Sequence, residues 1–233
     1  LIATATKRTE LFMAEKTAAT VVVSNRDANY LETFMPRSKI HTVGTIHRIT
    51  DVQVPFNERN GLLFIGSFAH MPNSDGLVWF FREVWEHIDP SIRRDGLKII
   101  GRNPPENLLK ISPSAVSYLG WVKSTIPFID SARLSISPLR FGGGIKGKVG
   151  EAWARGLPVI GTSSTFKGMI EPGSMDFPTA DDPLKFAELI NAVYASETAW
   201  TKSSEAGYQR VKETLSQEVA KKALVELIDF VSK

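Results

Sequence analysis

Short runs of apolar residues alternate with longer amphipathic stretches along most of this chain. The runs are rich in Val, Ile and Leu and are apolar at successive positions, which is typical of strands covered on both faces. The stretches between them have helical periodicity, so the pattern predicts an α/β protein built on a doubly wound parallel sheet. We expect strands at residues 19–24, 39–43, 62–67, 97–102, 116–120, 134–139 and 157–162.

A polar, irregular stretch at residues 47–61 divides the chain into two parts and ends at Gly61, as a linker does. We therefore expect a partial first unit at residues 1–50, a linker at residues 51–60 and an α/β unit at residues 61–233. The first residues look like neither a signal peptide nor a clean helix start, so we expect a fragment or a trimmed chain. Helices are expected at residues 25–35, 74–88 and 124–132, after the glycines at 142–144, and through residues 183–233.

The composition excludes several classes of protein. The absence of cysteine excludes disulfides and thiolate metal sites and is typical of a reducing cytoplasm, where we place the chain. Four scattered histidines do not favour zinc, and we expect neither a metal nor a cofactor. The net charge of +3 comes without a long Lys/Arg block, so no nucleic-acid partner is expected. No apolar run approaches the roughly 20 residues of a membrane span.

Glycines follow four of the expected strands, at the points where the chain turns toward a helix. In doubly wound sheets, ligands bind beyond the carboxyl ends of the strands, and these glycines all lie at such positions. Together they predict a site of the size of a nucleotide. The residues are Gly66 and Ser67, Gly101 and Arg102, Gly120 and Trp121, and Gly142, Gly143 and Gly144.

The last glycine group looks like a phosphate-binding loop with one residue changed. Gly142, Gly147 and Lys148 fit the pattern G-x-x-x-x-G-K, but Val149 stands where that loop has a magnesium-binding Ser or Thr. The glycines let backbone N–H groups approach an anion, and the following helix, Lys146 and Lys148 add positive charge. We interpret the loop as a diphosphate site; the alternative is a flexible turn with solvated lysines.

Glu151 lies three residues after Lys148, so the two side chains share a face of the expected helix. A carboxylate there can accept hydrogen bonds from both hydroxyls of a ribose whose phosphates lie on the loop. It can equally be a surface charge that complements the helix dipole. The spacing leaves both interpretations open.

Residues 141–162 resemble the donor-binding segment of the retaining GT-B glycosyltransferases of the glycosyltransferase group 1 family. Members commonly read G-x-G-x-[KR]-x-K-x-x-E-A and, after a small-residue helix, G-x-P-V-[IV]-[AG]-T. Residues 62–88 resemble the first strand and helix of the family's C-terminal domain, and residues 15–43 resemble the end of its N-terminal domain. The resemblance implies a Rossmann-like donor domain at residues 61–233 and a remnant of the acceptor-binding domain at residues 1–50. The matching positions are Gly142, Gly144, Lys146, Lys148, Glu151, Ala152, Gly156, Pro158, Val159 and Thr162.

The resemblance also implies roles for individual residues. Glu151 would bind the donor ribose and Lys148 would neutralise the diphosphate leaving group, which makes them the expected catalytic residues. This sequence departs from the family at Gly143, where many members have a second Glu, and at residues 66–75, which lack the usual phosphate-binding Arg and Lys. The expected donor-binding residues are Gly66, Ser67, Arg102, Gly120, Trp121, Val122, Gly142, Gly143, Gly144, Lys146, Lys148 and Glu151.

The activity that the resemblance implies is transfer of a sugar from a nucleotide-diphosphate sugar to an acceptor with retention. No D-x-D motif is present, so a metal-independent reaction is expected. The acceptor, a carbohydrate, lipid or other small molecule, would be held mainly by the rest of the N-terminal domain, and peripheral membrane association through that domain fits the same scheme. We expect this chain alone to bind donor without turnover. Two alternatives stay open: a non-catalytic nucleotide-sugar-binding or interaction module, favoured by Gly143, and a P-loop NTPase, disfavoured by Val149.

Other candidate residues have plainer explanations beside the functional ones. His70 and Asn73 could touch the donor or be solvated surface. Asp181 and Asp182 precede a proline, which favours a helix cap over a metal site. The aromatic residues at 79–85 favour core and interface packing over a sugar platform.

Overall fold

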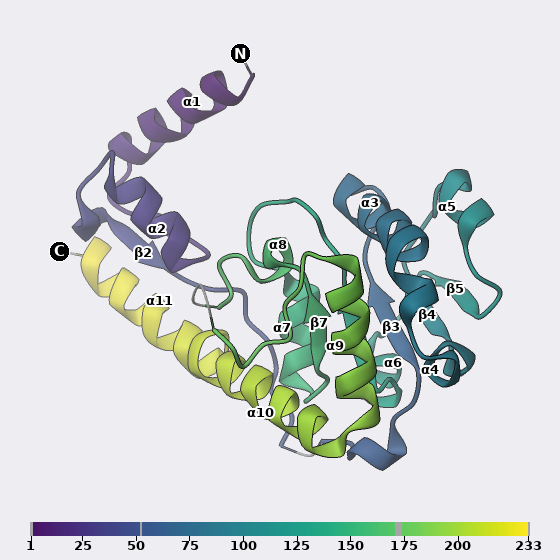
Figure 1. Cartoon of the computed structure of the whole chain (residues 1–233). Helices are drawn as coiled ribbons and strands as arrows, with labels where there is room; N and C mark the ends of the chain where they lie inside the picture. Colours follow the sequence, from purple (N-terminus) through teal and green to yellow (C-terminus); the bar gives the residue numbers. More distant parts are fainter. Residues whose placement is uncertain (1, 52, 171–173, 233) are drawn as a thin grey trace.

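A parallel sheet with the strand order β5-β4-β3-β6-β7 stands at the centre of the larger unit (Figure 1). The computed structural model describes residues 2–51, 53–170 and 174–232. From β3 the chain proceeds outward to β4 and β5, then returns to place β6 on the other side of β3. The winding therefore reverses between β3 and β6, which confirms the doubly wound α/β fold. The strands are β3 (Leu62–Ile65), β4 (Leu97–Ile100), β5 (Val116–Gly120), β6 (Leu134–Ser137) and β7 (Val159–Gly161).

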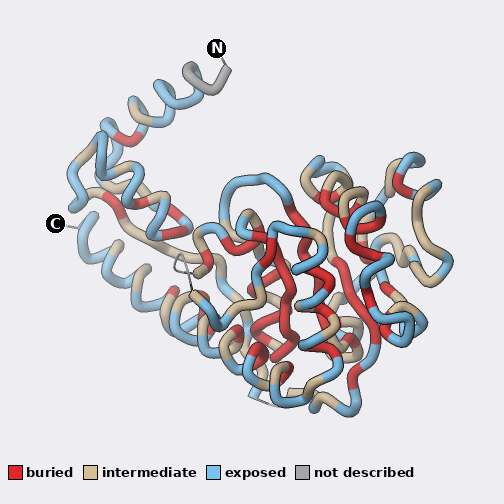
Figure 2. Tube along the Cα trace, viewed as in Figure 1, coloured by how far each residue is buried: buried red, intermediate tan, exposed pale blue. Residues whose placement is uncertain are grey.

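Helices cover both faces of this sheet because successive strand residues point to opposite sides. Leu62 and Phe64 belong to a core shared with α3 and α9, whereas Leu63 belongs to a second core shared with α6, α7 and α8. Figure 2 shows that burial follows the strands of the sheet and the inner sides of these helices. The helices of this unit are α3 (Met71–Trp79), α4 (Pro90–Asp95), α5 (Glu106–Ile111), α6 (Ile126–Ser131), α7 (Gly147–Ala154), α8 (Ser163–Phe166), α9 (Pro183–Ala195) and α10 (Glu197–Thr214).

The aromatic segment after α3 forms part of the first core. The helix widens into a π-helical segment at Phe80–Val84 and tightens into a 3-10 turn at Trp85–His87. Phe80, Phe81 and Trp85 are buried and contact one another edge-on or tilted. The expectation of packing rather than a sugar platform is confirmed. The expected helix cap is confirmed as well, because the Asp182 side chain accepts a hydrogen bond from the backbone N–H of Lys185 (3.0 Å) at the start of α9.

The first unit is a small α/β element with its own core. Strands β1 (Thr20–Val22) and β2 (Ile40–Thr42) pair in parallel, and α2 (Asn25–Glu32) connects them, with Val22, Ala28 and Ile40 buried between them. Helix α1 (Ile2–Lys16) precedes them and is not among the helices expected from the sequence. It has no acidic residue in its first turn and exposes most of its described side chains.

The last helix, α11 (Gln217–Val231), lies along the first unit rather than on the central sheet (Figure 1). Its Phe230 ring contacts the His41 ring of β2, with ring centroids 4.8 Å apart. The backbone N–H of His47 donates to the carbonyl of Leu215 just before this helix (2.9 Å). The end of the chain therefore packs against its beginning, and the division into units at residues 1–50 and 61–233 with a linker at residues 51–60 stays a prediction.

The buried side chain of Arg59 fastens the linker to the larger unit. Its guanidinium donates to the carbonyls of Val54 (2.8 Å), Ile129 (2.8 Å), Ala132 (3.2 Å) and Arg155 (3.0 Å). The last three carbonyls lie at the C-terminal ends of α6 and α7, where helix carbonyls lack partners and a cation is favoured. Burial lowers the pKa of Arg59 to about 10, so the group stays charged at neutral pH.

Arg59→Ala should lower the free energy of unfolding by about 3 kcal/mol or more, because each buried acceptor left without a donor costs about 1–3 kcal/mol. Urea denaturation monitored by circular dichroism would measure the change. Arg94→Ala is the matched control, since Arg94 is exposed, and should stay within about 0.5 kcal/mol of the wild type. Equal effects of the two substitutions would contradict the role given to Arg59.

Candidate functional site

The loops after β3 and β6 leave the sheet at the point where its winding reverses, and we call the region between them the crevice. This is where doubly wound sheets bind ligands. The loop after β3 leads into α3, and the glycine loop after β6 leads into α7. A bidentate ion pair joins the segments that follow these two strands, because Arg140 donates to both carboxylate oxygens of Asp75 (2.8 and 2.5 Å). Gly76 permits close packing here, since a Cβ at this position would lie 2.4 Å from the carbonyl oxygen of Pro138.

Lys148 carries the charge of this crevice. Its Nζ donates to Oδ1 of Asn73 (2.8 Å) and lies 4.6 Å from the centroid of the buried Phe64 ring. None of the ion pairs among the described residues includes Lys148. The side chain keeps part of its surface exposed. A cation held in this way lacks the carboxylate that would compensate its desolvation, which favours the binding of an anion.

Burial, and secondarily the charge of Lys146, lowers the pKa of Lys148 from 10.5 to about 7. The unfolded chain therefore binds more protons than the folded chain between pH 7 and 10.5, and the unfavourable burial of the ammonium is relieved as pH rises through this window.

Without ligand, Lys148→Met should be more stable than the wild type at pH 6. This advantage should shrink by about 1.4 kcal/mol per pH unit from pH 7 upward, as the wild-type ammonium deprotonates. Urea denaturation of both proteins from pH 6 to 10 measures the difference, in which the titration of all other groups cancels. A difference independent of pH would contradict a depressed pKa at Lys148.

The glycine loop has open space beside it and is held together by Lys146. Gly142 and Gly144 have φ values of 130° and 68°, which favour glycine, and a Cβ at Gly143 or Gly144 would meet no atom within 4 Å. The Nζ of Lys146 donates to the carbonyls of Gly143 (3.1 Å) and Gly144 (2.7 Å). Two carbonyls of the loop thus point to Lys146, and the space beside Gly143 and Gly144 leaves room for a ligand.

Alanine substitutions should separate the glycines that the backbone requires from the one that it does not. Gly142→Ala and Gly144→Ala should each cost about 1–2 kcal/mol, because a side chain is strained at positive φ. Gly143→Ala should leave the free energy of unfolding within about 0.5 kcal/mol of the wild type. Chemical denaturation measures the free energy of unfolding of all three variants, and a large loss of stability in Gly143→Ala would contradict the open space beside Gly143.

Glu151 lies one turn into α7, on the side of the loop that follows β5. Thr125 donates its hydroxyl to Oε1 of Glu151 (2.5 Å), which fixes the carboxylate and leaves Oε2 available. The His47 ring, from the segment just before the linker, fills the space over Gly150, where a Cβ would lie 2.4 Å from Nε2. Burial lowers the pKa of His47, and the charge of Glu151 opposes that shift. Glu151 and Lys148 thus have separate partners.

The structure brings some of the predicted site residues together and leaves others apart. Gly66 lies against the Asn73 side chain at the crevice, and the exposed Ser67 accepts a hydrogen bond from Asn73 through its carbonyl (2.8 Å). Arg102 instead lies over the exposed Trp121, 5.0 Å from a ring centroid, beyond β4 and β5. Gly120 has a positive φ of 67° beside them, and Val122 packs against the second core.

Three residues at the site were missed or undervalued by sequence reasoning. Asn73 is buried and holds Lys148, whereas His70 is exposed. Thr125 precedes α6 like an N-cap, yet its hydroxyl does not cap that helix and serves Glu151 instead. His47 lies just before the linker and has no local motif. Val149, by contrast, is buried in the core as expected and cannot ligate magnesium.

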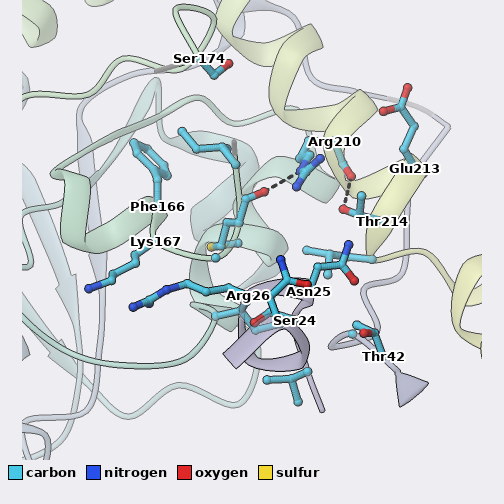
Figure 3. Close-up of a pocket in the computed structure, with 18 of the residues that line it drawn as sticks. Ser24, Asn25, Arg26, Thr42, Phe166, Lys167, Ser174, Arg210, Glu213 and Thr214 are labelled. Atoms are coloured by element: carbon cyan, nitrogen blue, oxygen red, sulfur yellow. Dashed lines mark hydrogen bonds between the residues drawn. The ribbon is translucent and has the colours of Figure 1, made fainter. Parts of the chain in front are cut away.

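A separate cleft of about 1320 Å³ opens between the first unit, the loop after α8 and the last two helices (Figure 3). Ser24, Arg26, Lys167 and Arg210 are among its lining residues. It borders the glycine loop at Ile145, but neither Lys148 nor Glu151 lines it. The cleft is therefore distinct from the Lys148 site, although the glycine loop contributes to both.

A family model described as "Glycosyl transferases group 1" matches residues 59–196, which include β3 to β7 and the Lys148 crevice. The chain belongs to this family. A search of curated proteins gave no match. No helix among the described residues is long and apolar enough to cross a bilayer, and their His, Asp and Glu side chains form no group of three that could hold a metal ion.

Solved glycosyltransferases share the fold at low sequence identity. TarM of S. aureus has a TM-score of 0.76 at 13% identity, over 97% of this chain and 46% of TarM. The pneumococcal O-GlcNAc transferase GtfA, solved with UDP and GlcNAc, has a TM-score of 0.72 at 19% identity, over 96% of this chain and 47% of GtfA. Sucrose-phosphate synthase from Thermosynechococcus elongatus has a TM-score of 0.72 at 14% identity, over 96% of this chain and 61% of the synthase. The fold is thus that of the GT-B glycosyltransferases, and the chain spans about half the length of the first of these proteins.

Proposed function

We propose that this chain is the donor-binding part of a retaining glycosyltransferase that takes a hexosyl group from a nucleotide-diphosphate sugar. The observation that carries the proposal is the ammonium of Lys148, which lies at the β3/β6 crevice beside an open glycine loop without a carboxylate partner. A diphosphate would supply the missing negative charge, and its charge grows as the sugar–phosphate bond breaks. A fixed cation that meets this growing charge lowers the barrier to transfer.

The carboxylate of Glu151 supports a donor whose diphosphate lies at Lys148 and whose ribose lies at Glu151. Thr125 holds one oxygen, and the other is free to accept hydrogen bonds from ribose hydroxyls while the phosphates lie toward Lys148, one turn of α7 away. We place the base near Trp121 and Arg102, whose stacked side chains lie beyond the ends of β4 and β5. The open space at Gly143 then faces the sugar.

The metal-independent, cytoplasmic reaction and the division of labour between domains are parts of the same proposal. Lys148 would provide the charge neutralisation that a metal ion provides in D-x-D enzymes, a motif that this sequence lacks. A neighbour of known structure was solved with UDP and GlcNAc, in keeping with a nucleotide-sugar donor. Since the chain spans 46–47% of TarM and GtfA, we propose that the acceptor, a carbohydrate or lipid, is held mainly by residues outside this chain, so that this chain alone binds donor without turnover.

Isothermal titration calorimetry with UDP, GDP, ADP and CDP in the presence of EDTA tests the donor site and identifies the base. Lys148→Met should weaken the preferred nucleoside diphosphate and inorganic pyrophosphate alike, by about tenfold or more, because it removes a charge-assisted contact. Glu151→Gln should weaken only the nucleoside diphosphate, because pyrophosphate has no ribose. Lys185→Met, at an exposed position of α9, should change neither.

Proton uptake provides an independent readout in the same titrations. At pH 8 the free Lys148 is mostly neutral, and a bound diphosphate should recharge it, so the wild type should take up nearly one proton more than Lys148→Met. At pH 6 this difference should vanish. Binding of none of the four nucleotides would overturn the proposal. So would binding of Mg-ATP alone, measured in a parallel titration without EDTA, if Glu151→Gln leaves that binding unchanged.

A further inference from the structure

Three cations from three different segments gather where the glycine loop borders the cleft. Arg26 belongs to the first turn of α2, Lys146 ends the glycine loop, and Lys167 directly follows α8. The pKa of Lys146 is lowered by burial and by the charges of Arg26 and Lys167, so the three groups share one electrostatic environment. Like charges repel, and a fold keeps them together most readily where an anion is bound.

The backbone brings these segments into contact at Gly168. A Cβ at this glycine would lie 3.7 Å from Oγ of Ser24 and 3.7 Å from Cγ2 of Ile145. Gly168 directly follows Lys167, Ser24 lies two residues before Arg26, and Ile145 directly precedes Lys146. In the view of Figure 3 the side chains of Arg26 and Lys167 point in the same direction. Both residues are exposed and both line the cleft. The pair is therefore accessible from the cleft.

No carboxylate of the described residues forms an ion pair with Arg26, Lys146 or Lys167. Lys146 donates to carbonyls of its own loop and so contributes charge rather than a free donor. Other basic residues of the cleft have backbone partners: Arg37 donates to the carbonyl of Ile40 and Arg210 to that of Met169. Glu213 also lines the cleft but lies across it from Arg26 in Figure 3.

We propose that Arg26 and Lys167, backed by the charge of Lys146, bind a phosphate group of the acceptor. This inference rests on the proposed function, since it assigns the donor diphosphate to Lys148, which does not line the cleft. Phosphate fits better than a neutral sugar hydroxyl, because its oxygens accept from a guanidinium and an ammonium together. The same group occurs on soluble sugar phosphates and on the headgroups of anionic lipids.

The test measures binding of glucose 6-phosphate to the chain by calorimetry, first alone and then with saturating UDP, with glucose as the unphosphorylated control ligand. We expect glucose 6-phosphate to bind in both cases and glucose to bind far more weakly. The variant Arg26→Ala/Lys167→Ala should lose about 100-fold in affinity for glucose 6-phosphate, tenfold for each charged contact. Its affinity for UDP should change less than twofold.

The double variant Arg82→Ala/Lys185→Ala removes the same two charges from exposed positions outside the cleft and should bind glucose 6-phosphate like the wild type. A parallel arm uses vesicles with phosphatidylglycerol or phosphatidylcholine. Binding to phosphatidylglycerol alone that requires Arg26 and Lys167 would assign the phosphate to a lipid headgroup. Thermal unfolding without ligand verifies that the variants remain folded.

Three outcomes would overturn the proposal. The first is equal weakening of UDP and glucose 6-phosphate in Arg26→Ala/Lys167→Ala, which would assign the cluster to the donor. The second is equal affinity for glucose and glucose 6-phosphate together with equal affinity for the two vesicle types. The third is an equal effect of the control variant. Failure of the proposed donor site is distinguishable, because UDP would then not bind while glucose 6-phosphate binding would still depend on Arg26 and Lys167.

Discussion

A half-buried ammonium at the reversal point of the sheet is the constraint on which the site depends. Lys148 extends from α7 to Asn73 in α3, so one hydrogen bond joins the two segments that follow β3 and β6. Because its charge has no carboxylate partner among the described residues, the free protein holds it at an energetic cost that shows as a lowered pKa. An anion that enters the crevice relieves this cost, so stability in the free state is exchanged for affinity.

The rest of the larger unit keeps this crevice in place. The two cores on opposite faces of the sheet fix β3 and β6 as neighbours, and Arg59 holds the C-terminal ends of α6 and α7 at the edge away from the ligand. With those ends anchored, the N-terminus of α7 and its glycine loop face the crevice. The Arg59 contacts and the proposed donor site thus lie at opposite edges of the same sheet, and doubly wound sheets bind ligands at the edge formed by the carboxyl ends of the strands.

Sequence reasoning predicted the elements of this unit better than the contacts of its site. Consecutive apolar residues such as Leu62 and Leu63 identify a strand buried on both faces, and the burial of Val149 followed from its place in the helix. The partner of Lys148 lies 75 residues away, and it is set by where α3 begins, which no local pattern determines. The role of Thr125 could not be predicted either, because a Thr before a helix usually caps that helix. Here its hydroxyl donates to Glu151 instead.

Two groups of cations lie near the glycine loop, and each can bind its own anion. Lys148 lies at the crevice, while Arg26 and Lys167 line the cleft. Lys146 directs its ammonium to the carbonyls of Gly143 and Gly144, which occupies these acceptors and compensates their partial negative charge. An anion beside Lys148 and a second anion beside Arg26 and Lys167 would each be neutralised by its own cations, so a charged acceptor could approach a charged donor without the repulsion that would otherwise keep them apart.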